Sequence, residues 1–147
     1  MRRNPRRPRL RGDDGYTLTE ILVVMAIIGL IAAVLTPGLI GQLSRARIKT
    51  AQVQLETIAA GVEMFRADVG RYPTTAEGLD VLLAQPSDVE GWTGPYIKSA
   101  KSLQDPWGTK VDYKAGTDGS GFIVTSFGAD GKADGTGQNR DLHAPGS

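Results

Sequence analysis

The residues best suited to chemistry lie near the C-terminus, in a segment rich in Gly, Asp and Asn that runs from Ser126 to Leu142. Carboxylate, amide and main-chain oxygens on a flexible loop suit Ca²⁺, which takes about six to eight oxygen ligands. An EF-hand loop counted from Asp130 fails, because Lys132 falls at its third position and Asp141 replaces the Glu of its twelfth. On composition alone, a calcium-binding loop and a disordered acidic tail explain the segment equally well.

Other kinds of catalytic or metal chemistry have few residues to work with. The chain of 147 residues contains no Cys and a single His, His143. These counts exclude a disulfide framework, a thiolate zinc site and a cysteine nucleophile, and they argue against a Ser-His-Asp site. No phosphate-binding loop is visible, and we expect neither an enzyme nor a nucleic-acid-binding protein.

Glu20 is the second residue of chemical interest, because it directly precedes an apolar run. Residues Ile21 to Ile40 carry no charge, and 20 helical residues span ~30 Å, the thickness of the hydrocarbon core of a bilayer. A buried core helix is the alternative, but a domain this small can hardly bury a helix that is apolar all round. A carboxylate at the edge of a membrane helix is costly unless it is paired. Glu20 is therefore either an interfacial residue favoured by the helix dipole or the partner of a cation on a neighbouring chain.

The charges are unevenly distributed along the chain. Residues 1–15 contain six arginines and two aspartates, a local charge of +4, so the remainder carries −3 of the net +1. The positive-inside rule then places the N-terminus in the cytoplasm and the C-terminal part outside it. A secretory signal peptide fits less well, since the apolar run is too long and lacks a small-x-small cleavage site.

After the apolar run, hydrophobic residues recur at alternating steps of three and four, which predicts an amphipathic helix. This stripe either forms a coiled coil or packs on the chain's own C-terminal sheet, and we favour the second interpretation. Val53 and Met64 lie off the stripe and are candidates for contacts with other chains. Pro37, with Gly38 and Gly41, predicts a bend or a locally melted stretch. The stripe consists of Ile48, Ala51, Leu55, Ile58, Val62, Phe65 and Val69.

The remaining segments predict an α+β fold, with a long N-terminal helix packed on a small antiparallel sheet. The helix should end near Gly70, and the capping-box spacing of Thr74 and Glu77 predicts a short helix over residues 79–83. Alternating residues at 110–114 and 122–127 predict a hairpin. The aromatic residues within the long loop 85–109 are either a ligand platform or anchors packed on the core, and we favour anchors.

The N-terminal pattern resembles the type IV pilin-like proteins: a short basic leader, Gly15, an aromatic residue, Thr-Leu-x-Glu and about twenty apolar residues. The resemblance implies cleavage by a prepilin peptidase between Gly15 and Tyr16, N-methylation of Tyr16, and an assembly role for Glu20 in neutralising the terminal amine of an adjacent subunit. Tyr16 stands where the family usually has Phe, and Thr19 where it usually has an apolar residue.

Later motifs resemble the major pseudopilins of type II secretion, the general secretion pathway protein G family. They are Gly70–Thr75 with Gly78-Leu79, Gly94-Pro95-Tyr96, Asp105–Gly108 and Ser126–Gly131. The resemblance implies a C-terminal metal-binding loop for Ca²⁺. Its implied ligands are the side chains of Asp130 and Asp141, the main-chain carbonyl of Phe127, and Asn139 as a further candidate. Arg140, beside Asp141, is an awkward neighbour for a cation site.

Together these resemblances imply a leader at residues 1–15, a membrane or filament-core helix at 16–41 and a periplasmic globular domain at 42–147. The expected function is that of a structural subunit of the pseudopilus, a filament that drives folded exoproteins through the outer-membrane secretin. Expected partners are further copies in a homopolymer, minor pseudopilins, the prepilin peptidase, the inner-membrane assembly platform and inner-membrane lipid. The expected location is the bacterial inner membrane, as a single-pass protein with a cytoplasmic N-terminus. A pilin of another type IV filament system, or an uncleaved membrane-anchored binding module, are the alternatives.

Overall fold

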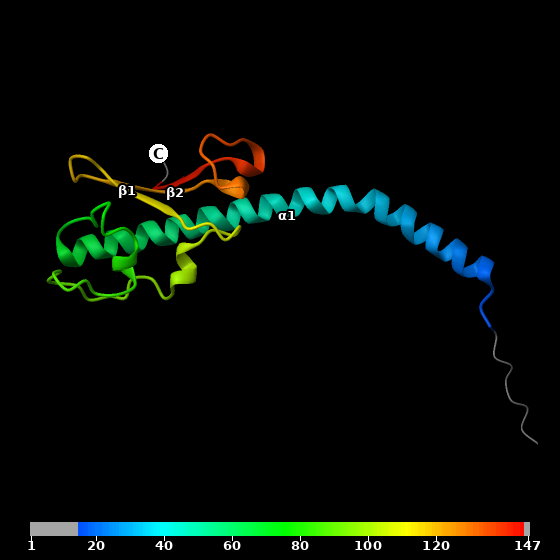
Figure 1. The fold of residues 1–147 in the computed structure, drawn as a ribbon, viewed down its shortest axis with the longest axis horizontal. Coiled ribbons are helices and arrows are strands. Elements are labelled where there is room, and N and C mark those ends of the chain that lie inside the picture. The colour runs from blue at the N-terminus through cyan, green and yellow to red at the C-terminus, as the bar shows by residue number, and fades with distance from the viewer. Residues whose placement is uncertain (1–14, 146–147) are drawn as a thin grey trace, which may run out of the picture. The chain divides into compact units, whose positions relative to one another are not determined.

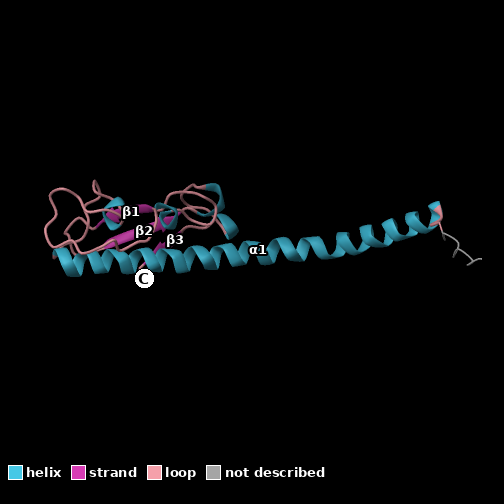
Figure 2. Ribbon diagram, turned by 90° about the horizontal axis from the view of Figure 1, so that it is seen from below, coloured by secondary structure: helices cyan, strands magenta, loops and turns pink. Residues whose placement is uncertain are grey.

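A computed structural model describes residues 15–145 of the chain. One long helix, α1 (Leu18–Val69), is followed by three short strands: β1 (Asp112–Ala115), β2 (Phe122–Ser126) and β3 (Leu142–Ala144). The strands form an antiparallel sheet in the order β1-β2-β3 (Figures 1 and 2). The chain divides into two compact units between Ile40 and Gly41.

The first unit contains the apolar start of α1. This part of the helix is long and apolar enough to cross a membrane, and none of its most apolar window is buried within the chain. Its large apolar side chains are exposed, for example Leu22 at 67% and Leu30 at 69%. Residues 15–145 therefore supply no cover for this surface.

The sequence predicts a bend or a locally melted stretch at Pro37, Gly38 and Gly41. The melted stretch is wrong. Helix α1 continues without a break from Leu18 to Val69. A proline lacks the N–H that would bond the carbonyl four residues earlier, but the residues on either side keep their own helical hydrogen bonds. One missing bond did not end this helix.

The second unit buries the predicted stripe against its own loops and sheet, as we favoured. In Figure 2 the strands lie alongside α1. Ile58, Val62 and Phe65 are 0% exposed, and Val124 of β2 and Leu103 join them in the same core. Removing such side chains from water is the main stabilising contribution to a small domain.

Helix α1 ends where the sequence predicts. Gly70 adopts φ +82°, a conformation that favours glycine, and its N–H donates to the carbonyl of Arg66 at 2.8 Å. The Thr74–Glu77 capping box also forms, with hydrogen bonds of 2.7 and 3.2 Å in the two directions. However, the expected helix over 79–83 is only a three-residue 3₁₀ turn, Asp80–Leu82. Gly78 at φ +62° ends the capped turn before a helix can develop.

The hairpin is confirmed, although β1 begins at Asp112, two residues later than the predicted strand, and β2 ends one residue earlier. Sequence analysis missed β3. This three-residue strand pairs Leu142 with Ser126 and Ala144 with Val124, and it ties the end of the Gly-Asp-rich segment to the sheet. Strands this short carry too few residues for an alternating pattern to be recognised.

The aromatic residues of the long loop are anchors, as we favoured. The Trp92 indole N–H donates to the carbonyl of Val81 at 2.8 Å. The Tyr96 ring meets Phe65 edge-on at 5.9 Å between centroids, and its hydroxyl donates to Asp68 at 2.9 Å. These contacts pack the loop on the end of α1.

Candidate functional site

Thr17, the second residue after the predicted cleavage position, caps the N-terminus of α1. Its hydroxyl accepts a hydrogen bond from the N–H of Glu20 at 3.2 Å, and its carbonyl accepts one from Ile21 at 3.2 Å. Sequence analysis missed this cap, although the Thr-x-x-Glu spacing is the same that predicted the box at Thr74 and Glu77. The cap places the start of the helix, Leu18, only two residues after Tyr16.

Glu20 lies in the first turn of α1, where the helix dipole favours a negative charge. Within residues 15–145, its carboxylate makes no ion pair and accepts no hydrogen bond. Tyr16 is 79% exposed, and nothing lies within 4 Å of a Cβ placed on Gly15. The predicted cleavage, methylation and assembly residues therefore lie together at an open end of the helix.

The C-terminal segment is an ordered double turn rather than a featureless tail. It contains two 3₁₀ turns, η3 (Gly128–Asp130) and η4 (Gly137–Asn139), which contact each other. Gly128 has φ +68°, and a Cβ there would lie 2.7 Å from the Asn139 carbonyl oxygen. A Cβ on Gly135 would overlap the same carbonyl. Two glycines thus let the loop close tightly around the main chain of Asn139.

Asp141 is the predicted ligand whose environment is most informative. Its Oδ2 accepts a hydrogen bond from the N–H of Asp134 at 3.0 Å, and Asp134 adopts a left-handed φ of +65°. Its Oδ1 is buried without a hydrogen-bond partner. A buried carboxylate oxygen without a partner costs free energy, and a bound cation would remove that cost.

The other predicted ligands lie in the same loop. The Asp130 side chain is exposed and Oδ1 accepts a hydrogen bond from the N–H of Lys132 at 3.2 Å. Phe127 precedes η3, and Asn139 ends η4. Among the described residues, no three side chains of His, Cys, Asp or Glu gather closely enough to hold a metal. A cation here would therefore need main-chain and amide oxygens in addition to carboxylates, as Ca²⁺ accepts.

A buried pair that sequence analysis missed fixes the start of the loop. Asp105 is 6% exposed and Ser126 is 1% exposed, and the Ser126 hydroxyl donates to Asp105 Oδ2 at 2.6 Å. The other oxygen of Asp105 accepts the N–H groups of Trp107 and Thr109 at 3.1 and 2.9 Å. Asp105 therefore joins its own turn to the end of β2, directly before Phe127.

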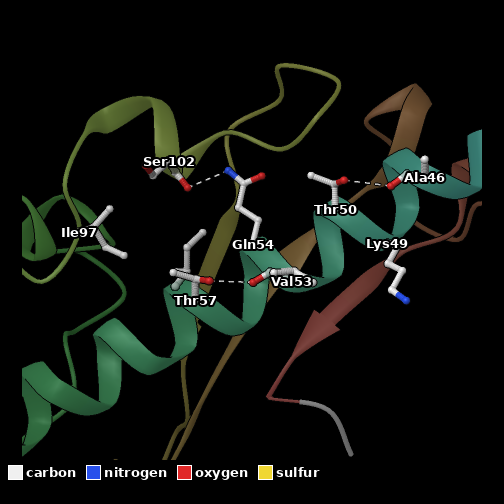
Figure 3. Close-up of a pocket in the computed structure, with 9 residues that line it drawn as sticks. Ala46, Lys49, Thr50, Val53, Gln54, Thr57, Ile97 and Ser102 are labelled. Carbon is white, nitrogen blue, oxygen red and sulfur yellow. Dashed lines mark hydrogen bonds between the residues drawn. The ribbon is translucent and has the colours of Figure 1, made fainter. Parts of the chain in front are cut away.

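An open apolar groove of about 580 Å³ follows one exposed face of α1 (Figure 3). The Gln54 amide donates to the Ser102 carbonyl at 2.9 Å across it, and Val53 is 55% exposed. The hydroxyls of Thr50 and Thr57 donate to carbonyls of their own helix, so they need no outside partner. Val53 and Met64, which is 58% exposed, remain candidates for filament contacts.

Comparisons with known proteins agree with both ends of the chain. The family model for type II secretion system (T2SS) protein G matches residues 38–145, and the model for the prokaryotic N-terminal methylation motif matches residues 10–36. The type II secretion system core protein G of Xanthomonas campestris is 34% identical over 137 residues, covering 93% of both chains. That of Pseudomonas aeruginosa is 36% identical, covering 90% of this chain and 94% of the relative.

A solved structure agrees with the fold. The crystal structure of the major pseudopilin from the type 2 secretion system of enterohaemorrhagic Escherichia coli is 27% identical in sequence. It superposes with a TM-score of 0.59, covering 72% of this chain and 88% of that one. The long helix with its small antiparallel sheet is therefore a known arrangement.

Proposed function

This chain belongs to the type II secretion system protein G family and is a structural subunit of the pseudopilus, and we propose that it polymerises with further copies into the filament that drives folded exoproteins through the outer-membrane secretin. The exposed apolar start of α1 carries this proposal, because that surface needs a cover that the described part of its own chain does not provide. Membrane lipid covers it before assembly, and neighbouring copies cover it in the filament.

We propose that the chain is first inserted into the inner membrane, with the N-terminus in the cytoplasm and the globular domain in the periplasm. The prepilin peptidase cuts between Gly15 and Tyr16 and methylates Tyr16. The leader, residues 1–15, lies outside the described residues apart from Gly15, and its six arginines support this orientation. The assembly platform and minor pseudopilins then complete the filament. No catalytic role is proposed for the chain itself.

We propose that Glu20 directs assembly by forming an ion pair with an adjacent subunit. Its carboxylate lacks a partner within residues 15–145 and lies in the first turn of α1, four residues after the proposed new terminus. A methylated amine remains positively charged at neutral pH. Pairing with the amine of an adjacent subunit would neutralise both charges as they enter an apolar filament core.

Intact-mass measurement of the chain from its host membrane tests this processing. We expect a species that begins at methylated Tyr16. In the same host, Glu20→Ala should abolish filaments while leaving membrane insertion intact, and Glu56→Ala, at an exposed acid farther along α1, should leave filaments intact. A retained Met1 would favour an uncleaved membrane-anchored module instead, and normal filaments from Glu20→Ala would refute the pairing.

We further propose that the loop from Phe127 to Asp141 binds Ca²⁺ through Asp130, Asp141 and the Phe127 carbonyl, with Asn139 as an additional ligand. The buried Oδ1 of Asp141 without a partner supports this proposal. Bound calcium would link the two halves of the loop by charge neutralisation and would hold β3 on the sheet. Arg140 need not oppose the cation if its side chain points out of the loop.

Calcium removal tests the metal site on the full chain in detergent. At a free Ca²⁺ concentration of 100 times Kd, binding adds about 2.7 kcal/mol to the free energy of unfolding, so EDTA should lower Tm by several degrees and added calcium should restore it. Asp141→Asn should abolish this response, whereas Asp88→Asn, at an exposed acid outside the loop, should preserve it. An unchanged Tm with EDTA would refute the ligand assignment.

A further inference from the structure

A second hollow on α1 gathers positive charge from two distant parts of the sequence. It has a volume of about 380 Å³ and is lined by Arg45, Ile48, Lys49 and Gln52 of α1 and by Arg140 of the C-terminal loop. We call it the basic pocket. Nearby, the Ser44 hydroxyl donates to the Gln138 side-chain oxygen at 3.0 Å. This bond ties the loop to α1 next to Arg140.

The cations of the basic pocket have no anionic partner in the part of the chain that the structure describes. Ion pairs form at Arg66, Arg71, Lys110 and Lys114, and no acidic side chain lines the pocket. Lys49 points away from Gln54 and Ser102 of the apolar groove (Figure 3). Like charges held close together repel one another, so an anion bound among them would be stabilised.

The donor set suits a phosphate. Two guanidinium groups offer paired N–H donors that match phosphate oxygens, the Lys49 ammonium adds a point charge, and the Gln52 amide adds a neutral donor. Half-buried Ile48 provides an apolar wall beside these donors. A phosphodiester with an attached glycerol fits such a mixed surface better than a small inorganic anion does.

The position of Arg45 indicates the source of the phosphate. Arg45 follows the last residue of the apolar run, Ile40, by five residues, which is about 7.5 Å of helix. The headgroup layer extends about 5–7 Å beyond the hydrocarbon core, and an arginine side chain can reach back toward it. We propose that the basic pocket binds the headgroup phosphate of an anionic phospholipid. The inference rests on the proposed membrane anchoring, but requires neither calcium nor the filament.

The chain offers a matched control. Arg47 lies on α1 between Arg45 and Lys49 and is exposed, but it does not line the pocket. General attraction between a basic segment and an anionic membrane would use Arg47 as much as Arg45, and would depend little on Arg140. A specific pocket would use Arg45 and Arg140 and ignore Arg47.

The experiment uses the full chain reconstituted into phosphatidylcholine vesicles that contain a small fraction of spin-labelled phosphatidylglycerol or spin-labelled phosphatidylcholine. Electron paramagnetic resonance then measures the lipid fraction whose motion the protein restricts. We expect preference for phosphatidylglycerol in the wild type. Arg45→Gln and Arg140→Gln should each reduce that preference roughly fivefold, the effect of one cation near a membrane surface, whereas Arg47→Gln should change it less than twofold.

Each other outcome overturns the proposal. Equal losses for Arg45→Gln and Arg47→Gln, with little loss for Arg140→Gln, would indicate general attraction only. Displacement of the label by millimolar inorganic phosphate would indicate a site for free phosphate. If Arg45→Gln and Arg140→Gln leave the lipid preference unchanged but reduce chemical cross-linking between copies in the same vesicles, the pocket binds an acidic side chain of a second copy instead. A loss of lipid preference in Arg140→Gln alone would also follow from misfolding of the C-terminal loop. Arg45→Gln controls for this effect, because Arg45 lies on α1, outside the loop. A chain that fails to float with the vesicles would refute the membrane anchoring and, with it, the lipid site.

Discussion

The two parts of α1 differ in what stabilises them. From Ile21 to Ile40 the helix carries no charge, and its large apolar side chains, where the structure describes them, are exposed. From Gly41 to Val69 it is amphipathic, and one stripe is buried in the core of its own domain. One continuous helix therefore has a part whose apolar surface is left open by the described residues and a part that its own domain covers.

The two Thr-x-x-Glu boxes, Thr17–Glu20 and Thr74–Glu77, differ in the same way, because only one of the two carboxylates has a partner among the described residues. Glu77 accepts two hydrogen bonds from Arg71 at 2.8 and 2.7 Å and one from the N–H of Thr74. Glu20 has no such partner among residues 15–145. The local pattern is the same, but one carboxylate has a partner inside the domain and the other has none within residues 15–145. The proposed assembly would give Glu20 its partner on a second subunit.

The largest expected effect comes from shortening a leucine in the buried part of α1. Leu55 is 1% exposed, so Leu55→Ala removes buried methyl groups and leaves a cavity. We expect the free energy of unfolding to fall by about 2–5 kcal/mol. Chemical denaturation of the full chain in detergent, followed by tryptophan fluorescence, measures this loss. A loss below about 1 kcal/mol would contradict the assigned core.

A smaller effect concerns the carboxylate that has its partner within the domain. The Arg71 hydrogen bonds lower the pKa of Glu77 from 4.5 to about 2, against the opposing effect of burial. Because the folded pKa is depressed, this stabilisation is complete above about pH 4.5 and is lost as the pH falls toward 2. We expect about 1–2 kcal/mol after allowance for solvent screening.

Comparison of Glu77→Gln with the wild type measures this contribution to the free energy of unfolding. Its unfolding free energy should be lower than that of the wild type at pH 7, and the difference should shrink as the pH falls from about 4.5 toward 2. Glu63→Gln, at an exposed acid in a 3.6 Å ion pair with Arg66, serves as control and should change stability by less than about 0.5 kcal/mol. A constant difference at all pH values would show that the Glu77 ion pair does not stabilise the fold.

The smallest expected effect completes the comparison between the two parts of the helix. Leu30 is 69% exposed, and Leu30→Ala makes the same chemical change as Leu55→Ala. We expect the unfolding free energy of the globular domain to change by less than about 0.5 kcal/mol, with any loss confined to filament yield. A destabilisation equal to that of Leu55→Ala would show that the apolar part of α1 is buried in its own domain.

Local patterns were enough to predict much of the fold. The hydrophobic stripe predicted which face of α1 is buried, Gly70 predicted the end of the helix, and turn residues between alternating segments predicted the hairpin. The predictions failed where competing local forces are close in strength. Pro37 costs one hydrogen bond without ending α1, and the capped turn at Thr74 stops at Gly78 instead of starting a helix.

The candidate site was predicted less completely. The residues of the proposed calcium loop could be named by resemblance, but their chemical setting depends on contacts between segments far apart in the chain. Nothing in the spacing of Asp105 and Ser126 indicates that a hydrogen bond of 2.6 Å joins them. Nor does the sequence indicate that Arg140 and Arg45, which lie far apart in the chain, line the same basic pocket.

By itself, the sequence determined the elements whose physics is local. An uncharged run of twenty residues must be helical and shielded from water wherever it lies, and a leader with six arginines biases its orientation. Only the tertiary structure decided which polar groups are satisfied. It buried Asp141 Oδ1 without a partner, gave Glu77 an arginine, and brought Arg140 to α1. These results depend on distances between residues that the chain brings together only when it folds.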